Sequence, residues 1–135
     1  MMEFPVINYW AVLVSALATF LIGSVWYSPL LFAKVWMEEL GFTKEGMSND
    51  KMVKIFSISF LLMLIIAFNL AGFIGPESDW QFGMTAGALA GIGWVGAAMG
   101  VNYLFERKSF RFWLINAGYM AVSFTLMGAI IGSWH

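Results

Sequence analysis

Residues 55–74 have the sequence IFSISFLLMLIIAFNLAGFI and contain no Asp, Glu, Lys, Arg or His. A stretch of about 20 apolar residues is long enough to cross the hydrocarbon core of a bilayer as an α-helix. A strand of a membrane barrel would be shorter and would alternate in polarity, which this stretch does not. The sequence therefore predicts a transmembrane helix, which with its flanking residues covers about 52–74.

The same pattern recurs three more times, at about 6–32, 80–105 and 110–134. Charged side chains are confined to position 3 and to the ranges 34–54, 77–79 and 106–111. We therefore predict an all-α fold: an integral membrane bundle of four transmembrane helices, in a single transmembrane domain over residues 1–135.

The composition excludes several other classes of protein. The chain has 135 residues, of which 61% are hydrophobic and 11% charged, and its net charge is −1. So few charges could not cover the surface of a soluble domain, and the hydrophobicity is too high for a disordered chain. No basic excess is present to bind nucleic acid. The absence of Cys excludes disulfides and Cys-ligated metals.

Punctuating residues predict where the helices end. Pro29 should end the first helix near Tyr27 or Ser28, and a short interfacial helix should follow near 30–40. Residues 41–51 form the predicted polar cytoplasmic loop. Ser78 and Gln81 fit a capping box with Ser78 as the N-cap of the third span, and the turn at 106–109 should be tight.

The basic residues predict the orientation of the chain, because loops rich in Lys and Arg stay in the cytoplasm. All seven lie beside the first and last connections between spans, so both termini are expected outside the cytoplasm. Since no other targeting segment is evident, the expected location is a bacterial inner membrane. Anionic lipid headgroups could bind some of these side chains, although topology alone also explains them; the candidates are Lys34, Arg107, Lys108 and Arg111.

The predicted spans contain no ionisable group that a proton-coupled transporter would need, because their only charged side chains, Lys54 and Arg111, lie at the edges of the second and fourth spans. The single His is the terminal His135, and no cluster of His, Cys and carboxylates has the spacing of a metal site. We therefore expect neither an enzyme nor a cofactor.

Small residues dominate the third span. Glycines at spacings of mostly four let helix backbones approach closely, so this span is predicted to be the central helix and a subunit interface of a homo-oligomer. Trp94, in the middle of this span, is expected to have a core role. The helix-packing glycines are Gly83, Gly87, Gly91, Gly96 and Gly100.

Polar side chains gather in the cytoplasmic half of the predicted bundle. They could line a vestibule that admits a small solute or ion, or they could form hydrogen bonds between helices. Both interpretations stay open from the sequence. The residues are Ser24, Tyr27, Ser28, Asn102, Tyr103, Asn116 and Tyr119.

Several of these residues lie in motifs that resemble a known family. The run from Gly23 to Met37, with sequence GSVWYSPLLFAKVWM, and the later segments 102–107, 113–119 and 127–134 are similar to a bacterial family of small membrane proteins. That family is catalogued only as a domain of unknown function. The resemblance implies a four-helix integral membrane protein and assigns no activity, substrate or cofactor.

Two functions remain compatible with the sequence. The first is a non-enzymatic scaffold or accessory subunit that acts through helix–helix or lipid contacts. The alternative is a small oligomeric channel or facilitator for an ion or small solute that is not coupled to protons.

Overall fold

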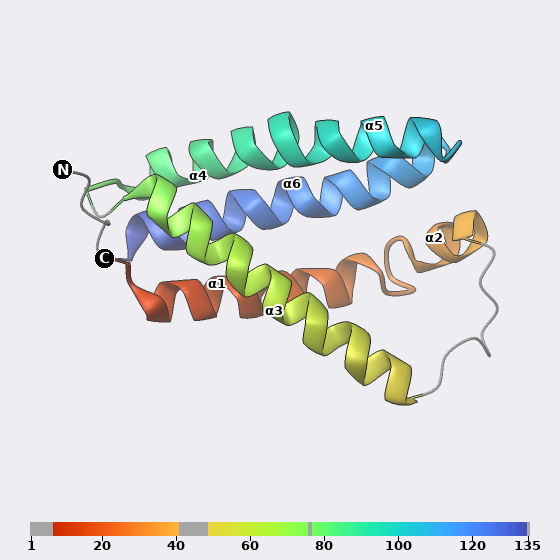
Figure 1. The fold of residues 1–135 in the computed structure, drawn as a ribbon, viewed down its shortest axis with the longest axis horizontal. Helices are drawn as coiled ribbons and strands as arrows, with labels where there is room; N and C mark the ends of the chain where they lie inside the picture. Colours follow the sequence, from red (N-terminus) through yellow and green to blue (C-terminus); the bar gives the residue numbers. More distant parts are fainter. Residues whose placement is uncertain (1–6, 41–48, 76, 135) are drawn as a thin grey trace.

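The computed structural model describes residues 7–40, 49–75 and 77–134, and it is predominantly helical (Figure 1). Within these residues, four helices are long and apolar enough to cross a membrane, which confirms the predicted all-α fold with four spans and a short additional helix. In chain order the elements are α1 (Tyr9–Trp26), α2 (Ala33–Leu40), α3 (Asn49–Ile74), α4 (Trp80–Leu89), the π-helical segment η1 (Ala90–Gly96), α5 (Ala97–Phe105) and α6 (Phe110–Ser133).

The first helix ends before the predicted boundary at residue 32. Its last residue is Trp26, and the backbone N–H of Tyr27 still donates to the Gly23 carbonyl at 3.0 Å. Pro29 has no backbone N–H and disfavours a helical conformation at the residue before it, so the chain turns here, as predicted. The short helix α2 consequently begins at Ala33 rather than near residue 30.

The predicted polar loop at 41–51 extends too far at its C-terminal end. Residues 49–51 belong to α3, which begins at Asn49, and residues 41–48 lie outside the described residues. Asp50 in the first turn favours this early start because a carboxylate interacts well with the positive end of the helix dipole.

The predicted N-cap of the third span is wrong by one residue. Asp79, not Ser78, caps α4: its carboxylate accepts the backbone N–H of Phe82 at 2.8 Å. The Ser78 hydroxyl instead donates to the carbonyl of Gly75 at 2.9 Å. Gly75 has a φ of +79°, a left-handed conformation that ends α3 and that glycine adopts without steric cost.

The turn between α5 and α6 is tight, as predicted, and it contains a strained residue. Arg107 has a φ of +60°. The N–H of Lys108 donates to the Tyr103 carbonyl at 2.8 Å, and that of Arg107 to the Leu104 carbonyl at 3.2 Å, the pattern of a Schellman motif in which glycine usually occupies the left-handed position. Ser109 then caps α6 by accepting the N–H of Phe112 at 3.0 Å.

The helix at the centre of the bundle is the fourth span, so the prediction of a central third span is wrong. α6 packs against α1, α3 and α4 (Figure 1). Of its most apolar window 39% is buried, against 17% for the third span. The third span has small residues on several sides, but it does not pack closely against several helices. Its closely packed glycines all face α6.

Glycines bring α4 and α6 into backbone contact. A methyl group on Gly83 would collide with the Gly128 carbonyl oxygen, and one on Gly87 would collide with the carbonyl oxygen of Phe124. A methyl group on Gly91 would lie 2.7 Å from the Phe124 Cβ. Such close approach lets membrane helices associate through van der Waals contact. Gly83 and Gly87 of α4 and Gly91 of η1, with Gly128 on α6, thus form a contact that we call the α4–α6 seam.

The third span also contains an irregularity that its sequence does not reveal. Residues 90–96 form a π-helical turn inside an otherwise α-helical span. The Gly96 carbonyl at its end accepts the indole N–H of Trp113 at 2.9 Å, and the same ring lies beside Gly100. Trp94 has 67% of its surface exposed and packs edge-to-face with Phe73 of α3 at 6.0 Å between ring centroids, so the expected core role is wrong.

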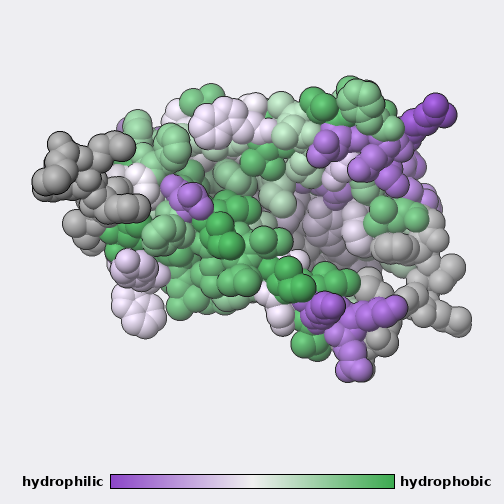
Figure 2. Space-filling view, viewed as in Figure 1, coloured by the Kyte–Doolittle hydropathy of each residue, from purple (hydrophilic) through white to green (hydrophobic). Residues whose placement is uncertain are grey.

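The surface separates by polarity along the long axis (Figure 2). Hydrophilic side chains gather at the end that holds α2, the start of α3 and the α5–α6 turn, and apolar side chains cover the middle. The first residues of α3 diverge from the bundle at that end (Figure 1). Side chains 50–58 of α3 are accordingly all exposed.

Candidate functional site

A hydrogen-bonded cluster joins three helices at the hydrophilic end. The Tyr27 hydroxyl, just after α1, donates to the Asn116 Oδ1 of α6 at 2.7 Å. The Asn116 Nδ2 donates to the hydroxyl of Tyr103 on α5 at 3.3 Å. All three side chains are half-buried. We call these residues the Tyr–Asn cluster, and each of them is among the polar residues selected from the sequence.

Tyr119 continues the cluster toward the middle of the bundle. Its ring lies edge-to-face with the Tyr27 ring at 5.5 Å between centroids, and its hydroxyl donates to the Thr19 carbonyl of α1 at 2.9 Å. Gly23 provides the space, because a methyl group there would lie 3.2 Å from the Tyr119 hydroxyl. Trp36 of α2 also packs edge-to-face with Tyr27, at 5.2 Å between ring centroids.

Two further hydroxyls lie deeper in the bundle, one on α1 and one on α6. Ser15 and Ser123 have no exposed surface, and neither Oγ atom has a hydrogen-bond partner. Ser15 is one turn from Thr19, and Ser123 is one turn from Tyr119. We call Ser15 and Ser123 the serine pair. The sequence analysis did not select these residues; their spacing of four from Thr19 and Tyr119 is the signal that could have identified them.

The remaining polar residues selected from the sequence do not join the cluster. The Ser24 hydroxyl donates to the Phe20 carbonyl of its own helix at 2.8 Å. Ser28 donates to the Val25 carbonyl at 2.6 Å within the turn that follows α1. Asn102 is exposed on α5. The structure therefore brings together Tyr27, Tyr103, Asn116 and Tyr119, and leaves the other three outside.

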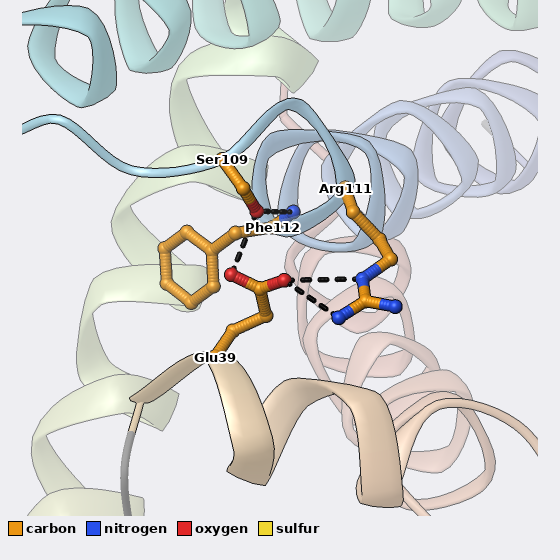
Figure 3. Close-up of polar contacts among 4 residues, drawn as sticks. All are labelled: Glu39, Ser109, Arg111 and Phe112. Carbon is orange, nitrogen blue, oxygen red and sulfur yellow. Dashed lines mark hydrogen bonds and ion pairs between the residues drawn. The ribbon is translucent and has the colours of Figure 1, made fainter.

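An ion pair joins α2 to the start of α6 (Figure 3). The Glu39 carboxylate accepts the Ser109 hydroxyl at 2.7 Å and the Arg111 Nε at 3.0 Å, and the Arg111 Nη2 lies 2.9 Å away. The hydrogen bond from Ser109, and next the contact with Arg111, hold the pKa of Glu39 below its ordinary value of 4.5. We call this group the α2–α6 clip.

The four candidate lipid-binding residues differ in what they contact. Arg111 is engaged by Glu39 while 60% of its side chain stays exposed. The Lys108 Nζ lies over the Phe112 ring, 5.5 Å from its centroid. Lys34 and Arg107 are exposed. Among residues 7–40, 49–75 and 77–134, no group of three or more His, Asp or Glu could hold a metal ion.

Comparison with known proteins agrees with the resemblance seen in the sequence. No curated protein and no solved structure matches the chain. Residues 10–132, which include the Tyr–Asn cluster and all but the end residues Tyr9 and Ser133 of the four spans, match the family described as "Protein of unknown function (DUF1761)". The chain belongs to this family of proteins of unknown function.

Proposed function

We propose that the protein is a non-enzymatic scaffold or accessory subunit of the bacterial inner membrane, which acts through contacts with lipid and with other transmembrane helices. The observation that supports this function is the low burial of the third span, where 17% of the most apolar window is buried. Leu89, Ile92 and Trp94 are each more than half exposed, so a whole face of this span is available to another helix.

A second copy of the chain is the partner that we propose for this face. Gly93 has no atom within 4 Å of where a methyl group would lie, and Ala97, one turn further, is exposed. Small residues one turn apart allow two helices to approach closely. The glycines of the α4–α6 seam within one copy have the same spacing of four residues.

Disulfide cross-linking in native membranes tests this association. Gly93→Cys introduces a thiol on the exposed face of the third span, in a chain that has no natural Cys. Leu21→Cys, on the exposed side of α1, is the matched control. We expect a cross-linked dimer from the first variant and not from the second. Absence of a dimer from both, together with single-step photobleaching in liposomes, would reject self-association.

Anionic lipid headgroups are the second proposed contact. Lys34, Arg107 and Lys108 belong to the hydrophilic end, where a basic segment beside a transmembrane helix attracts acidic lipids. Arg111 contributes less because Glu39 already engages it. Native mass spectrometry should detect retained phosphatidylglycerol, and Arg107→Gln with Lys108→Gln should reduce the retained fraction more than Arg111→Gln does.

The proposed orientation places the hydrophilic end in the cytoplasm and both termini outside. Lys34 on α2, Lys51 and Lys54 at the start of α3, and the basic residues of the α5–α6 turn all belong to that end. Positively charged loops are retained on the cytoplasmic side during insertion. This distribution supports the orientation, because the opposite end has no Lys or Arg.

The alternative function is a channel or facilitator for a small solute or ion. The line of polar groups that runs from the Tyr–Asn cluster through Tyr119 to the serine pair favours it. Since Tyr27, Asn116 and Tyr103 bond to one another rather than to an open space, we prefer the scaffold.

Flux measurements in liposomes separate the two functions. A scaffold should give the same ion and small-solute flux as protein-free liposomes. A facilitator should give a flux that Asn116→Leu abolishes, because this substitution removes the amide at the centre of the cluster. Asn102→Leu is the control, since Asn102 is exposed and outside the cluster.

A further inference from the structure

The serine pair is the most unusual polar feature in the interior of the bundle. Both Oγ atoms are completely buried, and neither makes a hydrogen bond of acceptable geometry with the protein, although the Tyr119 hydroxyl lies near Ser123. Ser15 follows the start of α1 by six residues and Ser123 precedes the end of α6 by ten, so both lie well inside their spans. An unpaired hydroxyl in an apolar interior is unfavourable, and such groups are normally satisfied by protein or by ordered water.

Other hydroxyls in α1, α4, α6 and the turn after α1 show what an isolated Ser or Thr usually does in an apolar environment. Each donates to a carbonyl three or four residues earlier in its own helix or turn. The serine pair departs from this pattern, because Ser15 and Ser123 do not donate to Ala11 or Tyr119, the residues four positions earlier. The hydroxyls that follow the pattern are those of Thr19, Ser24, Ser28, Thr85, Thr125 and Ser133.

The two serines lie at the same level of the bundle. α1 and α6 run antiparallel, since Asn8 at the start of α1 donates to the Trp134 carbonyl after α6. Tyr119 of α6 donates to the Thr19 carbonyl of α1. Ser15 precedes Thr19 by four residues and Ser123 follows Tyr119 by four, so one turn from this contact leads to both serines.

The geometry points to a binding site for one water molecule between Ser15 and Ser123, in the interior of the α1–α6 interface. Water is the smallest ligand that can donate to one hydroxyl and accept from the other, and buried waters typically make about three hydrogen bonds. Tyr119 supplies the third partner, because its hydroxyl donates its proton to Thr19 and its oxygen can still accept. This site does not depend on the scaffold function.

A double-substitution cycle tests the site. Ser15→Ala and Ser123→Ala, alone and together, are measured by reversible unfolding in bicelles. Each single substitution should raise the unfolding equilibrium constant about two- to tenfold, the typical effect of one hydrogen bond. The double variant should be about as stable as the less stable of the two single variants, because the first substitution already releases the water. Ser24→Ala is the control, since its hydroxyl bonds to its own helix.

Two outcomes would overturn the site. One such outcome is that the single substitutions leave the unfolding equilibrium constant unchanged or lower it. A methyl group would then suit the interior at least as well as the hydroxyl, so the hydroxyl had no hydrogen-bond partner. If the effects multiply in the double variant, the serines act independently. A density map of the protein in lipid nanodiscs gives a second measurement: a peak within hydrogen-bond distance of both Oγ atoms is expected. Oγ atoms turned to the carbonyls of Ala11 and Tyr119 would contradict it.

Discussion

Glu39 and Arg111 are 72 residues apart in sequence, and their side chains form an ion pair that joins α2 to the first turn of α6. Ser109 adds a hydrogen bond to the same carboxylate, so one side chain of α2 holds two residues at the start of α6. α2 also carries Trp36, which packs on Tyr27 of the Tyr–Asn cluster. We therefore predict that the position of α2 over this cluster depends on the charge of Glu39.

Acidification should release α2. The folded contacts lower the pKa of Glu39, so their stabilising contribution is fully present above its ordinary value of 4.5. This contribution is lost as the pH falls through the lower folded-state pKa. Electron paramagnetic resonance between labels at Lys34→Cys and Leu114→Cys should show a narrow distance distribution at about pH 6 and a broader one once the pH falls below the lowered pKa of Glu39.

Glu39→Gln separates this effect from general acid unfolding. The variant cannot pair with Arg111 as a carboxylate, so its distribution should be broad at about pH 6 already. Its helical circular dichroism should be unchanged because α2 is short and the four spans remain. A distribution in the unsubstituted chain that stays narrow at low pH would argue against a clip controlled by Glu39.

The α4–α6 seam should not tolerate a methyl group. Gly87→Ala places a Cβ against the Phe124 carbonyl oxygen, and overpacking of this kind costs about 1–3 kcal/mol. Gly93→Ala, on the open side of the same span, should be neutral or should stabilise by about 0.5–1 kcal/mol, because alanine favours helix over glycine. Reversible unfolding in bicelles measures both variants, and equal effects would disprove the seam.

A glycine should stabilise the α5–α6 turn. Arg107 is held at a φ of +60°, which costs a residue with a side chain about 1 kcal/mol. Arg107→Gly should recover about this amount in the free energy of unfolding. Lys108→Gly, at the next position, should give no gain because only the preceding residue occupies the left-handed region of the motif. If Arg107→Gly instead lowers the free energy of unfolding, the contacts of the guanidinium stabilise the protein by more than the backbone strain at Arg107 destabilises it.

Asn116 should matter more than either tyrosine that it contacts. Asn116→Leu removes two interhelical hydrogen bonds, each worth roughly 0.6 kcal/mol, and leaves Tyr27 without its acceptor. Tyr27→Phe removes one. Thermal unfolding in detergent should therefore rank Asn116→Leu as less stable than Tyr27→Phe, and the double variant should be close to Asn116→Leu alone. Additive losses would show that Tyr27 and Asn116 are not coupled.

Much of the architecture was predictable because hydrophobic length and backbone chemistry determine it. Apolar runs located all four spans, Pro29 located the end of α1, and the charged turn at 106–109 located the start of α6. These features act locally, within a few residues of where they appear. Ser78 shows the limit, since Asp79 beside it competes for the same N–H groups and caps the helix instead.

Packing between helices was harder to predict. The glycines of the third span show that a close contact exists, but they do not show which helix makes it or which faces stay open. Trp94 was expected in the core and is exposed, because the side of the span that packs is set by α6. The π-helical turn at 90–96 ends at Gly96, whose carbonyl accepts the indole N–H of Trp113 on α6, a contact that the local sequence does not indicate. Ser15 and Ser123 acquire their significance only from the pairing of α1 with α6.

Labelling of introduced cysteines tests the four-crossing membrane topology most directly, because the chain has no Cys of its own. Ser78→Cys lies between the second and third spans, and Lys108→Cys lies between the third and fourth. In spheroplasts, a membrane-impermeant maleimide should label the first variant, and should label the second only after permeabilisation. The reverse pattern would contradict the orientation, and labelling of both in sealed spheroplasts would contradict a membrane crossing between them.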